Sequence, residues 1–163
     1  GRVRNIPGKL EAICISDRTN ATTIEYYRWN ESGFIQDYGV KEGEALDTDI
    51  FKIAPAGNYF ISSQRGAVYE VSNSLKKIGE INTNQYSFND FAFNQNGSLI
   101  YAATKNEKSI KIIEYPSLTV VGEIQTRGYV SKIFRDDNRI VAISNSFPNS
   151  TGSISYVIEC LQV

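Results

Sequence analysis

The sequence contains no histidine, no methionine and only two cysteines among its 163 residues. Histidine is the commonest general base, so its absence excludes a Ser-His or Cys-His nucleophile within these residues. Cys14 and Cys160 are far apart in sequence, which excludes the short ligand spacing of a structural zinc site. We therefore expect no catalytic residue, no metal ligand and no cofactor in this chain.

Long apolar runs and an excess of charge are also missing. No run approaches the ~20 apolar residues that a membrane-spanning helix needs. A net charge of -1 offers nothing to attract nucleic acid or an anionic membrane non-specifically. The chain does contain 41% hydrophobic and 12% aromatic residues, including 10 Tyr, which is enough for a core. We therefore expect a protein as partner, with no nucleic acid and no membrane span.

A repeat occupies the middle of the chain. Residues 53–61 match residues 93–101 at an offset of 40, and residues 74–83 match residues 117–126 at an offset of 43. The offset changes inside a turn, where structural repeats tolerate insertions. With two weaker flanking copies we count four repeats, approximately residues 3–46, 47–88, 89–130 and 131–163.

Each repeat has the pattern of short β-strands. Ser109–Glu114 and Ala67–Val71 alternate apolar and polar residues and are rich in β-branched and aromatic types. Asn96-Gly97 suits a tight turn that needs positive φ, and no stretch keeps a helical period. A period of roughly 40–45 residues is typical of a four-stranded propeller blade. The sequence thus predicts an all-β fold: a β-propeller or propeller portion of about four blades, each of four antiparallel strands.

Gly97, Leu99–Ala102, Ser109–Ile113 and Thr119–Ile124 together resemble a YVTN-type or wider WD-repeat-like propeller repeat. The resemblance is good over about residues 51–126 and loose elsewhere. The chain lacks the Trp-Asp dipeptide, the Gly-His pair, the kelch double glycine and the sialidase Asp-box. The resemblance implies a ring of blades with an interaction face, and no particular activity.

The last repeat predicts only three strands, around Ile133-Phe134, at 139–144 and at 153–160, so this blade lacks its outer strand. Closed propellers often obtain such a strand from the amino terminus, but the first residues here already resemble the inner strand of the first blade. We therefore expect the carboxy-terminal part of a larger propeller of roughly six to eight blades. A self-contained four-bladed ring and a ring completed by a second copy are the alternatives.

Cys14 and Cys160 fall in non-equivalent predicted strands, so a disulfide, which needs Cα atoms within about 7 Å, is not expected. We expect two buried thiols that pack as small apolar groups, which leaves the redox compartment open. Glycosylation-type sequons start at Asn20, Asn30, Asn96 and Asn149, and turn chemistry is the simpler explanation for them. The family resemblance implies an extracytoplasmic location: secreted, periplasmic or on the cell surface.

An enzyme that uses only carboxylates is an alternative. Its candidates are Asp47 and Asp49, in the longest predicted connection between blades, which could also offer oxygens to Ca²⁺. The connection lacks the ligand spacing of a calcium loop. A solvated acidic loop is the simpler interpretation.

Binding through one face of loops is the better hypothesis. In a propeller, the loops that join successive blades and the loops between the second and third strands of each blade lie at the same end. Arginine and tyrosine anchor many interfaces because they bury flat surface and keep a polar group. The predicted partner-binding residues are Asp47, Arg65, Tyr86, Arg127, Tyr129 and Phe147, with Arg18, Asn84, Gln85 and Lys105 nearby.

These residues also have structural interpretations. Tyr86 and Tyr129 could fill the space between blades, and Arg65 and Arg127 could pair with Glu107 or Asp90. We expect a non-catalytic interaction module that binds a protein or other ligand. The alternatives are a fragment of a propeller enzyme, with carboxylates or a cofactor supplied elsewhere, and a surface carbohydrate-binding or adhesion propeller. Remaining blades of a parent chain, or a second copy, are further expected partners.

Overall fold

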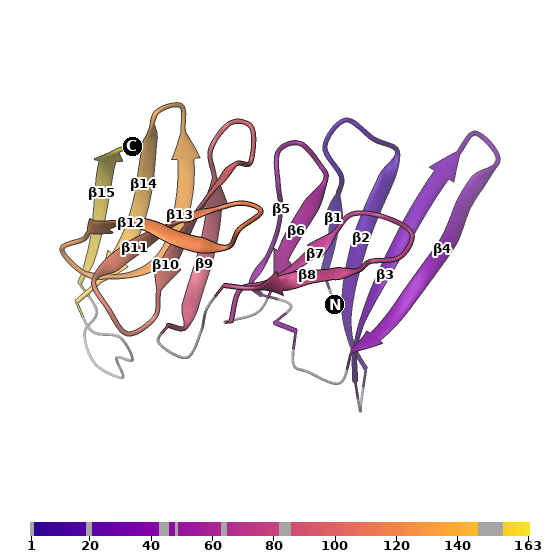
Figure 1. The fold of residues 1–163 in the computed structure, drawn as a ribbon, viewed down its shortest axis with the longest axis horizontal. Helices are drawn as coiled ribbons and strands as arrows, with labels where there is room; N and C mark the ends of the chain where they lie inside the picture. The colour runs from indigo at the N-terminus through magenta and orange to yellow at the C-terminus, as the bar shows by residue number, and fades with distance from the viewer. Residues whose placement is uncertain are drawn as a thin grey trace. The chain divides into compact units, whose positions relative to one another are not determined.

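The computed structural model describes residues 2–18, 21–42, 46–47, 49–62, 65–81, 86–146 and 155–163. These residues form fifteen β-strands and no helix, which confirms the all-β prediction. The strands make three four-stranded sheets and one three-stranded sheet (Figure 1). Within the described residues no helix has the length and apolar character needed to cross a membrane.

Within each sheet, every strand pairs with the next strand in the sequence. The first sheet contains β1 (Arg2–Asn5), β2 (Glu11–Arg18), β3 (Ala21–Asn30) and β4 (Gly33–Glu42). The second contains β5 (Phe51–Ile53), β6 (Tyr59–Ser62), β7 (Ala67–Glu70) and β8 (Lys77–Glu80). The third contains β9 (Phe88–Phe93), β10 (Leu99–Thr104), β11 (Ser109–Glu114) and β12 (Thr119–Gln125). The fourth contains β13 (Tyr129–Asp136), β14 (Arg139–Asn145) and β15 (Tyr156–Gln162). As predicted, the last sheet has three strands.

Turns at equivalent places have the same geometry. Gly57 and Gly97, 40 residues apart, both have positive φ, at 64° and 75°, and each donates its N–H to the carbonyl three residues earlier. Leu75 and Leu118, 43 residues apart, both have positive φ, at 45° and 55°. The two sequence offsets therefore correspond to two turns that the second and third sheets share.

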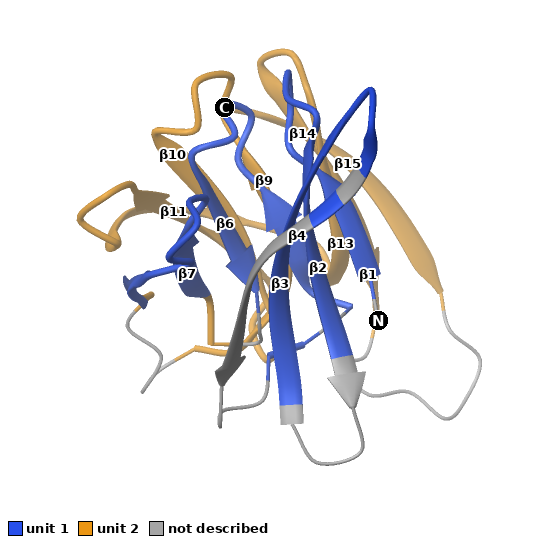
Figure 2. Cartoon of the chain, turned by 90° about the vertical axis from the view of Figure 1, so that its right-hand side faces the viewer, with its two compact units in different colours: residues 1–63, 67–79 blue, residues 64–66, 80–163 orange. Residues whose placement is uncertain are grey.

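The chain divides into two compact units (Figure 2). Unit 1 contains residues 1–63 and 67–79, and unit 2 contains residues 64–66 and 80–163. The core of unit 1 joins Ile13, Ile15, Ile24 and Tyr26 of the first sheet to aromatic residues such as Phe60 of the second. The alternation of β2 and β3 places these apolar side chains on one face of the first sheet.

The core of unit 2 lies between the third and fourth sheets. The third sheet contributes Tyr101, Ala103 and Ile110, and the fourth contributes Ile133 and Ile140, among others. Side-chain hydrogen bonds also join the innermost strands of the two sheets. Asn89 Nδ2 donates to the carbonyl of Val130 at 2.9 Å, and the buried Asp90 carboxylate accepts the N–H of Ile133 at 3.1 Å. These bonds fix the position of β13 on β9 where the sheets share no backbone ladder.

The other face of the fourth sheet is mostly apolar, with Lys132 as a charged member, and none of the described residues covers it. Phe134, Val141 and Cys160 form one cross-strand row, and Ile143 and Ile158 belong to the next. Phe134 is 50% exposed and Ile158 is 71% exposed.

Cys14 and Cys160 are both thiols. Cys14 lies half-buried in β2, and Cys160 lies exposed in β15. The prediction that both are buried is therefore wrong for Cys160. Its side chain lies on the uncovered face of the fourth sheet, in a strand that pairs on one side only.

Candidate functional site

Three connections of unit 2 meet at one end of the third sheet. The N–H of Lys105, in the β10–β11 connection, donates to the carbonyl of Ser87, which precedes β9. The N–H of Thr126, which follows β12, donates to the carbonyl of Lys108. These bonds hold together the segments that carry Tyr86, Arg127 and Tyr129. We call the resulting group the unit-2 rim: Tyr86, Lys105, Glu107, Lys108, Lys111, Glu123, Arg127, Tyr129 and Glu159.

Lys111 is the central cation of the unit-2 rim. It is 5% exposed, and its Nζ lies 2.9 Å from a carboxylate oxygen of both Glu107 and Glu123. The Nζ also lies 4.6 Å from the ring centroid of Tyr86, within the range of a cation–π contact. This ammonium group therefore fixes one aromatic ring and two carboxylates at once.

The protonation of this cluster follows from its contacts. Burial by itself would lower the pKa of Lys111, but hydrogen bonds to Glu107 and Glu123 outweigh it and the pKa is raised. Hydrogen bonds from Lys111 and Ser109 hold the pKa of Glu123 below its ordinary value. Lys111 and Glu123 are therefore both ionised at neutral pH.

Tyr129 and Arg127 form the other part of the unit-2 rim. Lys108 Nζ lies 5.4 Å from the ring centroid of the half-buried Tyr129. The N–H of Arg127 donates to both carboxylate oxygens of Glu159, at 3.0 and 3.1 Å. Arg127 is exposed, and none of the carboxylates in the described part of the chain pairs with its guanidinium. The Arg127 cation therefore faces solvent beside a cation-capped tyrosine.

Gly128 determines the positions of the neighbouring Arg127 and Tyr129 side chains. A Cβ at this position would lie 2.6 Å from the carbonyl oxygen of Asn145 and 2.9 Å from Cβ of Ser144. Both atoms belong to β14, which is held between β13 and β15, so a glycine is required where the connection crosses the end of this strand. The hydroxyl of Thr126 donates to the Gly128 carbonyl at 2.8 Å and closes the turn.

The other predicted residues have different surroundings. Asp47 belongs to unit 1, where its carboxylate accepts the N–H of Asp49 at 2.9 Å and its carbonyl accepts the Ser62 hydroxyl. This is local turn chemistry. Arg65 is exposed in the turn before β7. Phe147, Asn84 and Gln85 lie outside the described residues, as does the side chain of Arg18.

Lys108, Lys111, Glu123 and Glu159 were not among the predicted residues. Lys111 lies directly opposite Glu123 in the β11–β12 pair, so a hairpin register could have identified this charge pair. Glu159 comes from β15, and no local pattern links it to Arg127.

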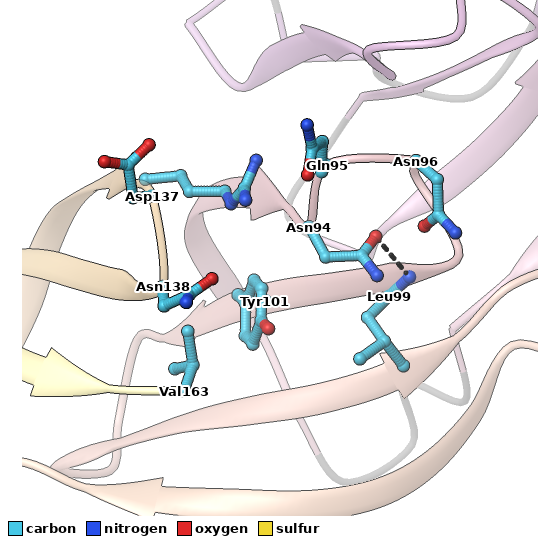
Figure 3. Close-up of a pocket in the computed structure, with 9 residues that line it drawn as sticks. Asn94, Gln95, Asn96, Leu99, Tyr101, Asp137, Asn138 and Val163 are labelled. Atoms are coloured by element: carbon cyan, nitrogen blue, oxygen red, sulfur yellow. Dashed lines mark hydrogen bonds between the residues drawn. The ribbon is translucent and has the colours of Figure 1, made fainter.

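A pocket of about 370 Å³ lies at the other end of the same two sheets (Figure 3). It is formed by the β9–β10 turn, the β13–β14 turn and the end of the chain, and its lining residues are Asn94, Gln95, Asn96, Leu99, Tyr101, Arg135, Asp137, Asn138 and Val163. The Asn94 carboxamide accepts the N–H of Leu99 and donates to the Ser98 hydroxyl, both at 3.0 Å. The wall of the pocket is thus held in place by its own turn.

Two of the four sequons take part in turns of the same kind. The side-chain oxygens of Asn30 and Asn96 accept the N–H of Ser32 and Ser98, at 2.9 and 3.0 Å. The other two, at Asn20 and Asn149, lie outside the described residues. Among the residues that the structure does describe, no group of three or more carboxylates or cysteines is placed to hold a metal ion.

The sequence matches no protein-family model and no curated protein. Among solved structures, it is similar to the crystal structure of the Myceliophteria thermophila Cps50 (Swd1) β-propeller domain, with a TM-score of 0.64 at 16% sequence identity. The match covers 83% of this chain and 47% of that chain, so the protein spans about half the length of the domain that it resembles. The fold is therefore that of a WD-repeat-like β-propeller, with four antiparallel sheets of which the last has three strands.

Proposed function

We propose that the chain is a non-catalytic interaction module whose unit-2 rim binds an acidic segment of a protein partner. The observation that carries this proposal is the distribution of charge on the unit-2 rim. Glu107 and Glu123 are paired with Lys111, and Glu159 accepts the Arg127 N–H and the Ser144 hydroxyl. Lys108 and Arg127 remain exposed beside Tyr129. A half-buried tyrosine with exposed cations beside it suits a partner that offers carboxylates and apolar contact.

The propeller fold supports this proposal because propellers present their loops on one face for recognition. A YVTN-type ancestry of the repeats belongs to the same proposal and rests on the sequence resemblance alone.

The double variant Arg127→Ala/Tyr129→Ala tests the proposal. Partners captured from a native extract with the wild-type chain are identified by mass spectrometry, purified and titrated against both proteins. We expect the double variant to bind at least ~30-fold more weakly, because each residue has the chemistry of an interface anchor. Arg139→Ala, which removes an exposed arginine at the opposite end of β14, is the matched control. Equal affinity of the double variant and the wild type would overturn the assignment.

We further propose that the uncovered face of the fourth sheet receives another propeller blade, from a longer parent chain or from a second copy. Counted from the turns, Phe134, Val141, Ile143, Ile158 and Cys160 hold the places that Ala92, Tyr101, Ala103, Ile110 and Ile112 hold in the third sheet. In the third sheet those residues pack against the fourth. The 47% coverage of the Swd1 chain is consistent with blades beyond these four.

A further inference from the structure

The β10–β11 hairpin reaches further than its counterpart in the second sheet. β10 and β11 each have six residues, whereas β6 and β7 each have four, and β6 and β10 follow turns of the same geometry, at Gly57 and Gly97. The two extra residues on each strand move the connecting residues 105–108 outward by roughly 7 Å, at about 3.3 Å per residue. This connection carries Lys108, one of the two exposed cations of the proposed binding site.

Glu107 is held in this connection through both its carbonyl and its carboxylate. The buried Thr104 hydroxyl lies 2.9 Å from the Glu107 carbonyl and 2.7 Å from the Ser109 carbonyl, so it ties the two ends of the connection together. One carboxylate oxygen of Glu107 accepts the Ser109 hydroxyl at 3.3 Å and lies 2.9 Å from Lys111 Nζ. The peptide that links Glu107 to Lys108 is therefore placed by contacts of both the main chain and the side chain of Glu107.

Lys108 connects this hairpin to the next sheet. Its carbonyl accepts the N–H of Thr126 at 2.9 Å, and its Nζ lies 5.4 Å from the ring centroid of Tyr129. A long lysine side chain has many rotamers, and a backbone fixed at its base restricts where the ammonium group can lie. The conformation of the β10–β11 connection therefore decides whether the cation of the third sheet meets the ring of the fourth.

We propose that Glu107 is a positioning residue of the unit-2 rim: its carboxylate holds the connection so that Lys108 lies beside Tyr129. The inference rests on the proposed function and adds the residue that arranges a cation of that site. Through its charge alone, Glu107 would oppose the binding of an acidic segment. As a positioning residue it favours the same binding, so the two roles predict effects of opposite sign when its side chain is removed.

The position of Lys108 can be measured without a partner. The ring current of Tyr129 should shift the Hε resonances of Lys108 upfield in a ¹H–¹³C correlation spectrum, where Lys108→Arg assigns them by their loss. We expect Glu107→Gln to keep this shift, because its side-chain oxygen still accepts the same hydrogen bonds. Glu107→Ala should lose it, and Asn106→Ala, at an exposed residue of the same connection, is the control that should keep it. An upfield shift that survives in Glu107→Ala would overturn the proposal.

Binding is tested with an acetylated hexaglutamate peptide, titrated against the 163-residue chain by calorimetry. Glu107→Ala should weaken binding about two- to fivefold, as expected for one exposed charge contact, because Lys108 is no longer held at the site. Glu107→Gln removes the same negative charge and should bind at least as tightly as the wild type. Tighter binding by Glu107→Ala, or equal affinities of the two variants, would refute the positioning role.

Failure of this proposal is distinguishable from failure of the proposed function. If hexaglutamate does not bind, or binds Arg127→Ala/Tyr129→Ala as tightly as the wild type, the unit-2 rim is not a site for acidic segments. The Lys108 resonances of the Glu107 variants then still decide whether Glu107 positions Lys108. If the double variant loses binding and the two Glu107 variants behave alike, the site stands and the positioning role fails.

Discussion

Lys111 shows how a single residue organises the candidate site. Its ammonium group is buried, yet it stays charged because two carboxylates and an aromatic face replace the water that it lost. The same contacts position Tyr86 and pair Lys111 with two carboxylates, of which its single charge offsets one. The charges and the ring that the unit-2 rim exposes therefore depend on a buried residue.

This arrangement predicts a pH dependence of stability that is specific to Glu123. The pKa of Glu123 is lower in the folded protein than the ordinary value of 4.5, so its contribution is fully present above that value and is lost as the pH falls through the folded pKa. Urea unfolding of the wild type and of Glu123→Gln, followed by circular dichroism between pH 7 and pH 3, measures the difference between their free energies of unfolding. This difference should shrink as the pH falls. The difference at pH 7 should be roughly 0.5–1 kcal/mol, because the Glu123 side chain is partly exposed.

Glu31→Gln, at an exposed turn of the first sheet, is the control. The difference between its free energy of unfolding and that of the wild type should stay constant over this pH range. A difference for Glu123→Gln that stays constant with pH would contradict the assigned role.

At the scale of elements, side chains connect sheets that share no backbone ladder. The third and fourth sheets pack through apolar faces, which are non-directional and do not by themselves set how one sheet is placed along the other. The hydrogen bonds from Asn89 to the Val130 carbonyl and from the Ile133 N–H to Asp90 supply that direction. They lie on β9 and β13, the innermost strands of the two sheets. The placement of β13 on β9 determines the position of Tyr129, the first residue of β13.

Replacement of Asn89 by alanine should therefore cost more than the loss of an exposed polar group. We expect Asn89→Ala to lower the free energy of unfolding by about 1–2 kcal/mol, because the Val130 carbonyl loses its side-chain donor. Chemical denaturation followed by far-UV circular dichroism measures the loss. Asn73→Ala, in an exposed turn of the second sheet, is the matched control, and an equal loss in the two variants would show that the bond does not matter.

At the scale of the whole molecule, each of the two compact units contains a core, and the fourth sheet has a mostly apolar face that nothing in the described chain covers. Large contiguous apolar patches on soluble proteins mark interaction surfaces. The same positions are buried in the third sheet, so this face has the chemistry of a surface between blades.

The double variant Phe134→Thr/Ile158→Thr tests this interpretation. Threonine keeps the strand propensity and removes most of the apolar surface. The wild-type chain should associate as its concentration rises in sedimentation velocity experiments, and the double variant should stay smaller. Its stability should change by less than about 1 kcal/mol because both side chains are exposed.

Val121→Thr, on the exposed outer strand β12, should leave the association of the wild type unchanged. If the double variant associates as strongly as the wild type, the uncovered face is not where copies meet. An extracytoplasmic location stays a prediction from the sequence, and a carboxylate-based enzyme and a carbohydrate-binding or adhesion propeller stay alternatives to the proposed interaction module.

Several features of the fold were predictable because they depend on local rules. Ser109–Glu114 alternates in polarity, and it forms β11. Gly97 was expected to need positive φ and has it, and its counterpart Gly57 follows from the repeat offset. The burial of Lys111 and the exposure of Cys160 could not be predicted in the same way. Each depends on which sheet covers a given face, and that is a property of packing between distant segments.

The amino-acid sequence by itself determined that the chain forms short antiparallel strands in repeated sheets, because side-chain alternation and turn preferences act over a few residues. Only the tertiary structure decided which charges are paired and which apolar face is uncovered. These outcomes depend on groups that are brought together from different strands, and the free energy of burying or pairing a group is set by those neighbours and not by its place in the chain.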